Sequence, residues 1–143
     1  MRLAALAFAS GCVTPYATSA HPDGALTQLG CIDVALSATH RSEATGPILV
    51  VSLGNRCEHH AHVDLGALRV VAGNDVLTAN ATAYDPGNEI EPRTIAARES
   101  GDEWIEYRSA MLLESIEWLD VDVGGVAPDA GRSEHWVRVK VSP

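Results

Sequence analysis

The stretch that decides the fold runs from Cys31 to Thr39 and reads CIDVALSAT. From Ile32 onward, apolar residues recur at every second position, and polar or small residues fill the positions between them. Because side chains on a strand point alternately to its two faces, this pattern predicts a half-buried β-strand. The run from Ile48 to Leu53 is apolar almost throughout and rich in β-branched residues, which is typical of a central strand covered on both faces.

Further short segments of the same kind follow along the chain. They are separated by turn residues such as Pro86-Gly87 and Gly124-Gly125. A single helix-compatible stretch, Ser109 to Ser115, predicts one short helical crossover. The sequence therefore predicts an all-β fold, an antiparallel β-sandwich of seven or eight strands over residues 31–143. Besides the two segments above, the stretches with strand character are 61–65, 68–71, 76–79, 90–97, 103–107, 119–123 and 137–141.

Length and composition describe one globular unit. The chain has 143 residues, of which 46% are apolar and 20% charged, an ordinary mixture for a single domain. It carries 19 acidic residues against 10 Lys and Arg, a net charge of −9. This balance argues against a nucleic-acid partner, because phosphate binding needs a basic stripe. No apolar run is long enough for a transmembrane helix.

Residues 1–11 are typical of a secretion signal. Met1-Arg2 is a short basic start, and an apolar stretch follows it. The ending Ala9-Ser10-Gly11-Cys12 resembles the bacterial lipobox, which implies that Cys12 becomes the lipidated first residue of the mature chain.

Residues 12–30 are then expected to hold the lipidated cysteine and a flexible tether, because they contain Pro, Gly and small residues without sustained periodicity. The alternative is an ordinary signal peptide that is cut after Ala17-Thr18-Ser19-Ala20.

The cysteine count agrees with an exported protein. Three cysteines are present, an odd number for an oxidising compartment. If Cys12 carries lipid, Cys31 and Cys57 remain and are expected to form a disulfide. Closing a loop of about 25 residues contributes about 3 kcal/mol in the chain-entropy treatment. The alternative is a pair of buried free thiols, and a metal pair is disfavoured because the spacing is not Cys-x-x-Cys.

Histidines gather in the segment Glu58-His59-His60-Ala61-His62-Val63-Asp64. On a strand, His60, His62 and Asp64 fall on one face, and imidazole and carboxylate ligands suit Zn²⁺ or Cu²⁺. These three residues are the candidate metal site. A tight site usually recruits a ligand from a second strand, so the alternative is a solvated polar face beside the disulfide.

Trp136 is a candidate contact for a partner. It alternates with Val137 and Val139, which places it with Arg138 on the outer face of the predicted last strand. An exposed aromatic ring beside a cation can mark an interaction surface. The alternative is that the ring only packs on a long Arg or Lys side chain.

A family resemblance rests on four short motifs. The region from Cys31 to Val141 resembles the immunoglobulin-like β-sandwich domains of exported bacterial lipoproteins, and more narrowly a family of uncharacterised lipoproteins. This resemblance implies an immunoglobulin-like fold and supplies no catalytic residues. The motifs that carry it are Gly54-Asn55-Arg56-Cys57, Val63-Asp64-Leu65, Tyr84-Asp85-Pro86 and Glu103-Trp104-Ile105-Glu106-Tyr107.

These observations favour a non-enzymatic protein. The chain lacks a Gly-x-Ser-x-Gly elbow and a phosphate-binding glycine loop. We expect a lipid-anchored domain of the bacterial cell envelope that acts as a binding or assembly module for an envelope protein, without a cofactor. The outer membrane is favoured over the inner, because Val13 replaces the Asp that signals inner-membrane retention. The alternative is a periplasmic protein that handles Zn²⁺ or Cu²⁺ through the His59–His62 cluster.

Overall fold

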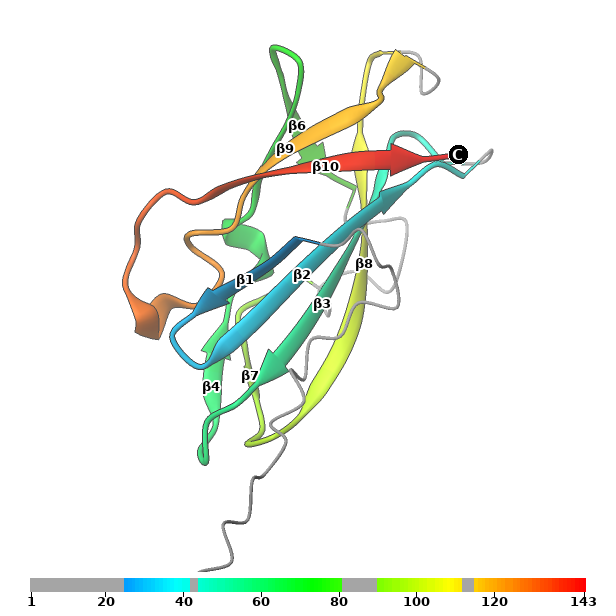
Figure 1. The fold of residues 1–143 in the computed structure, drawn as a ribbon. Helices are drawn as coiled ribbons and strands as arrows, with labels where there is room; N and C mark the ends of the chain where they lie inside the picture. The colour runs from blue at the N-terminus through cyan, green and yellow to red at the C-terminus, as the bar shows by residue number, and fades with distance from the viewer. Residues whose placement is uncertain (1–24, 42–43, 81–89, 112–114) are drawn as a thin grey trace, which may run out of the picture.

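Strands dominate the computed structural model, which describes residues 25–41, 44–80, 90–111 and 115–143 (Figure 1). Within these ranges no α-helix is present, and none of their helices could cross a membrane. Short 3-10 helices, η1 and η3, cover Leu65–Ala67 and Pro128–Ala130. The strands are β1 (Ala25–Leu29), β2 (Ile32–Thr39), β3 (Ile48–Asn55), β4 (Ala61–Val63), β5 (Arg69–Ala72), β6 (Asp75–Ala79), β7 (Arg93–Ile95), β8 (Ser100–Arg108), β9 (Trp118–Asp122) and β10 (Trp136–Ser142).

Strands β2 and β3 form the longest ladder of the sheet. They pair antiparallel over their full lengths, from Ile32 opposite Asn55 to Thr39 opposite Ile48. Every residue of β3 is buried, as its continuous apolar run predicts. β2 is also buried along nearly its whole length, because β1 and β10 lie along its other edge.

The large sheet closes on itself. Its strands follow the ring β2-β10-β9-β5-β6-β8-β3, and β3 returns to β2. The closing contact between β10 and β2 is parallel, with Val141 opposite Ala38, and the ends of both strands lie together in Figure 1. The remaining pairs of the ring are antiparallel. The protein is therefore a mixed seven-stranded β-barrel with additional strands β1, β4 and β7.

The predicted immunoglobulin-like antiparallel sandwich is wrong. Alternation along a strand shows which side chains face inward. Sandwiches and barrels both have inward-facing side chains at every second position, so alternation does not distinguish them. The difference lies in which strands pair, and the pairing of β10 with β2 joins segments about a hundred residues apart. Nothing in the alternation of either strand signals that contact.

Two expectations about connecting segments also need correction. The sheet begins at Ala25, inside the range 12–30 that was expected to be a tether, because β1 pairs antiparallel with β2. The expected helical crossover from Ser109 to Ser115 is not an α-helix where the structure describes it, and residues 112–114 lie outside the described ranges. The motif Tyr84-Asp85-Pro86 also lies outside them.

A buried carboxylate reinforces one of the two shortest pairings in the ring. β6 and β8 share only two residue pairs, Thr78 with Arg108 and Ala79 with Tyr107. Next to them Glu106, only 6% exposed, accepts hydrogen bonds from the backbone N–H of Thr45 and from Nδ2 of Asn80. The two donors come from opposite sides of β8, so Glu106 ties the segment before β3 to the end of β6.

We predict that Gly46→Ala destabilises the barrel. A Cβ atom at Gly46 would lie 1.6 Å from the carbonyl oxygen of Tyr107, so the backbone beside β8 would have to shift. We expect a loss of about 2 kcal/mol or more in the free energy of unfolding, measured by urea denaturation. Gly101→Ala is the matched control, because a Cβ there meets open space. Equal stability of the two variants would contradict this packing.

Candidate functional site

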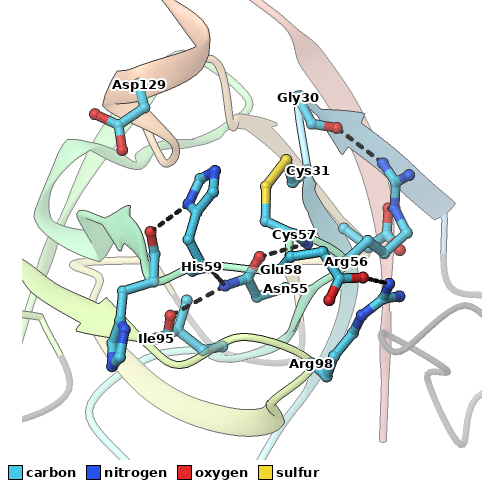
Figure 2. The surroundings of a disulfide bond; sticks show 12 residues. Gly30, Cys31, Asn55, Arg56, Cys57, Glu58, His59, Ile95, Arg98 and Asp129 are labelled. Carbon is cyan, nitrogen blue, oxygen red and sulfur yellow. Dashed lines mark hydrogen bonds and ion pairs between the residues drawn. A yellow bond between two sulfur atoms is a disulfide. The ribbon is translucent and has the colours of Figure 1, made fainter.

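A disulfide fixes the corner where β2 begins and β3 ends. Cys31 and Cys57 are bonded, with their Cα atoms 5.4 Å apart (Figure 2), which confirms the predicted pair. The backbone N–H of Arg56 also donates to the carbonyl oxygen of Cys31, over 2.9 Å. The loop after β3 is therefore held against the start of β2 by one covalent bond and one backbone hydrogen bond.

Asn55 organises this corner from within. It is fully buried, and its Nδ2 donates to the carbonyl oxygens of His59, Ile95 and Ala96. Its Oδ1 accepts the backbone N–H of Cys57 over 2.9 Å (Figure 2). One side chain thus satisfies backbone groups of the disulfide loop and of the segment after β7.

Arg56 ties the same loop to β2 at a further point. Its Nε donates to Oδ1 of Asp33 over 2.9 Å, and its Nη2 donates to the carbonyl oxygen of Gly30 over 2.8 Å. Asp33 is fully buried, and the Arg56 side chain is 28% exposed. The motif Gly54-Asn55-Arg56-Cys57 therefore has a structural role, since each of its polar side chains holds the corner together.

The structure does not assemble the predicted metal site. His62, on β4, pairs its Nδ1 with Oδ2 of Asp129 over 2.8 Å, and both side chains are more than 60% exposed. Asp64 donates its backbone N–H to the carbonyl oxygen of Val126 instead, and His60 is exposed. In the described ranges, no three His, Cys, Asp or Glu residues form a group that could hold a metal ion.

Sequence reasoning missed Asp129. It lies 67 residues beyond His62, in η3, and the contact between β4 and η3 depends on how the barrel closes. The hydrogen bond from His62 lowers the pKa of the Asp129 carboxyl below its ordinary value. The only local signal was an acidic residue directly after Pro128, which is common in the first turn of a helix and indicates no partner.

A small hollow lies beside the disulfide. It has a volume of about 220 Å³ and a largely apolar lining, which includes Ile32, Ala61 and Ala130 besides the two cysteines. His59, His62 and Asp129 also line it. Figure 2 shows the His59 ring on the side of the corner where Asp129 lies. A hollow of this size can hold one apolar group, which is less than most ligand pockets enclose.

A second candidate is the outer face of strands β5, β9 and β10. Leu119, Val121, Val137 and Val139 point into the barrel and are buried, so the residues between them point outward. Trp136 and Trp118 are each 45% exposed on this face. Trp136 lies beside Asp122 in the ladder, and Trp118 beside Lys140. Both predicted contact residues, Trp136 and Arg138, are therefore on the outer surface.

Ion pairs run across this face, one of them between the two indoles and the other level with Trp136. Arg138 donates from Nε to Oδ1 of Asp120 over 2.9 Å. Arg69, on β5, binds Asp122 through Nε and Nη2 and donates from Nη2 to Oε1 of Glu134 over 2.7 Å. Strand register predicts the first pair, because Arg138 lies opposite Asp120. Arg69 could not be assigned from sequence, because its pairing with Asp122 depends on the contact between β5 and β9.

Asp122 anchors this arrangement. Its side chain is 7% exposed, and burial alone would raise the pKa of the carboxyl. The backbone N–H groups of His135 and Gly124, together with the Arg69 guanidinium, outweigh burial and hold the pKa of Asp122 below its ordinary value. The folded protein therefore stabilises the ionised form of the Asp122 carboxyl.

Comparisons with known proteins show a shared fold. No protein-family model matches the chain, and no curated protein does. The yjhA protein from Bacillus subtilis, whose crystal structure is solved, is similar with a TM-score of 0.55 and 9% identical residues. The alignment covers 82% of this chain and 96% of that one. At this level of identity the likeness concerns the fold alone.

We predict that Asn55→Ala strongly destabilises the protein. The change leaves backbone groups of the corner without their buried partner, and such groups cannot recover bonds to water. We expect a loss of about 3 kcal/mol in the free energy of unfolding, measured by urea denaturation of the oxidised protein. Asn74→Ala, in the exposed turn between β5 and β6, is the control and should change it by less than about 0.5 kcal/mol.

We predict an acid-dependent contribution from Asp122. The pKa of Asp122 is lower in the folded state than in the unfolded state. Ionised Asp122 therefore stabilises the fold fully at pH values above its unfolded-state pKa of about 3.9. This stabilisation is lost as the pH falls through the folded-state pKa. Between about pH 5 and pH 2, the wild type should therefore lose more stability than Asp122→Asn does. Urea unfolding at several pH values measures the stability of the wild type and of Asp122→Asn. Asp102→Asn is the control, because Asp102 is an exposed residue of β8. Parallel pH profiles for the wild type and Asp122→Asn would contradict this assignment.

Proposed function

We propose that this chain is a lipid-anchored, non-enzymatic binding or assembly module of the bacterial cell envelope, with the outer membrane favoured over the inner. The disulfide supports export, because such bonds persist in oxidising compartments. It occupies Cys31 and Cys57, so Cys12 is the one remaining cysteine of the sequence. That cysteine is the residue at the end of the lipobox-like sequence, and it lies outside the described residues.

The resemblance to exported lipoproteins is compatible with this proposal. Of its motifs, Gly54-Asn55-Arg56-Cys57 builds the disulfide corner, and Glu106 of the last motif holds the β6–β8 contact together. Both are roles in stabilising a scaffold. Proteins that share such residues share the contacts that stabilise the fold. Their outer surfaces can still bind different partners.

The observation that carries the binding role is the outer face of β5, β9 and β10. Two indoles are exposed there, although indole is costly to leave in water and is enriched where proteins bind partners. A catalytic role has less support. The His62–Asp129 pair is open to solvent on both sides, and the sulfur atoms beside it are joined in the disulfide. The metal-handling alternative has less support, because the described residues include no group of three His, Cys, Asp or Glu that could hold a metal ion.

We predict that Cys12→Ser moves the protein out of the membrane fraction. Without the thiol no acyl chain can be attached, and no other anchor is proposed. Immunoblotting of membrane and soluble fractions from a bacterial host measures the distribution, and incorporation of labelled palmitate measures acylation. Ser10→Ala is the control, because it keeps a small residue at a neighbouring position of the same sequence. Membrane association that persists unchanged in Cys12→Ser would contradict the anchor.

A further inference from the structure

The two indoles of the outer face form a spaced pair. Trp118 and Trp136 lie on neighbouring strands, and the register of β9 with β10 separates them by four residues. At about 3.4 Å per residue and about 4.8 Å between strands, their Cα atoms lie roughly 14 Å apart. Between them is the Asp120–Arg138 ion pair. The apolar surface is therefore divided into two platforms with a polar step between them.

Neighbouring side chains hold both rings. The guanidinium carbon of Arg69 lies 5.2 Å from the centroid of the Trp136 ring, and the Lys140 ammonium lies 6.0 Å from that of Trp118. The same Arg69 donates to Glu134, two residues before Trp136 in the chain. Rings that are held before a ligand arrives lose little conformational entropy when it binds.

The charges of the face balance one another. Arg69 and Arg138 are paired with carboxylates, and Lys140 lies against the Trp118 ring. Three cations and three carboxylates leave the face without net charge, so it attracts neither a polyanion nor a polycation. The Asp120–Arg138 pair remains accessible, with side chains 36% and 66% exposed. Exposed ion pairs of this kind contribute little to stability and can exchange their hydrogen bonds with hydroxyl groups. The charged residues of the face are Arg69, Arg138, Lys140, Asp120, Asp122 and Glu134.

The dimensions of the face do not suit a protein partner. Three strands span about 10 Å, and the distance between the rows of the two indoles is about 13 Å along the strands. A stable protein interface covers about 800 Å² on each partner and has a continuous apolar centre. Here the centre is an ion pair and the apolar rings are at the two ends. A linear ligand with alternating apolar and hydroxyl surfaces matches that order.

We propose that this face binds a neutral, unbranched oligosaccharide. The C–H groups of a pyranose face carry small positive charges and stack on the electron-rich face of an indole. One sugar unit would stack on Trp136 and another on Trp118, while hydroxyl groups between them bond to Asp120 and Arg138. This inference rests on the proposed binding module and specifies the chemistry of its partner.

Titration of the full chain in detergent tests the proposal. The probes are cellohexaose and chitohexaose, with the anionic hexamer of galacturonic acid as comparison, and intrinsic tryptophan fluorescence and calorimetry report binding. We expect saturable binding of at least one neutral hexamer, and a loss of affinity of about tenfold or more in Trp118→Ala and in Trp136→Ala. Arg138→Ala should also weaken binding.

Trp104→Ala is the matched control. Trp104 is 41% exposed on β8, with the Arg41 guanidinium carbon 5.1 Å from its ring centroid, but β8 lies across the barrel from β9 and β10. Its removal should leave affinity unchanged. The proposal is wrong if no neutral hexamer binds, if Trp104→Ala weakens binding equally, or if the galacturonate hexamer binds more tightly. The fractionation of Cys12→Ser tests the lipid-anchored module and does not depend on sugar binding. A failure of the oligosaccharide proposal is therefore distinguishable from a failure of the proposed function.

Discussion

The parallel contact between β2 and β10 is the constraint on which the rest of the structure depends. β2 pairs with β1 and β3 in antiparallel ladders, and its last residues pair with the end of β10. Without the last contact the ring would open between β2 and β10, and both strands would expose unpaired backbone groups there. Closure removes these edges, which otherwise favour aggregation. It also determines which residues from distant parts of the chain become neighbours.

The disulfide corner reinforces β2 at its other end. β10 holds the end of the strand, while Cys31, next to its start, is bonded to Cys57 and Asp33 to Arg56. The buried Asn55 then links this corner to the segment after β7. These contacts occupy polar groups that would otherwise be buried without partners, so the corner tolerates little change.

Sequence patterns predicted most of the strands but not their arrangement. The alternation around Ile32 and the apolar run before Leu53 place β2 and β3 to within a few residues, because burial on one or two faces leaves a direct trace in composition. Counting cysteines predicted the Cys31–Cys57 bond. The ring of pairings leaves no such trace. Neither does the strand character of residues 25–29, whose apolar positions do not alternate with polar ones.

The same division applies to the two candidate sites. Neighbours within one ladder of adjacent strands, such as Arg138 and Asp120, follow from alternation once β9 and β10 are paired. Arg69 and Asp122 are also ladder partners, but their strands β5 and β9 are not consecutive in the chain, so the pairing itself had to be known first. The contact of His62 with Asp129 follows from no ladder at all. The histidine segment looked like a metal site because its ligands were close in sequence. Its strongest polar contact instead comes from η3.

Burial of Asp122 connects the barrel to the properties of its outer face. The carboxylate is fixed by backbone N–H groups from the β9–β10 connection and so provides a stationary anion at the surface. Arg69 binds to it and is thereby positioned against the Trp136 ring and Glu134. With the Arg69 guanidinium against its ring, Trp136 is held in place and is still 45% exposed. The network that stabilises the end of the barrel therefore also keeps Trp136 available to a ligand.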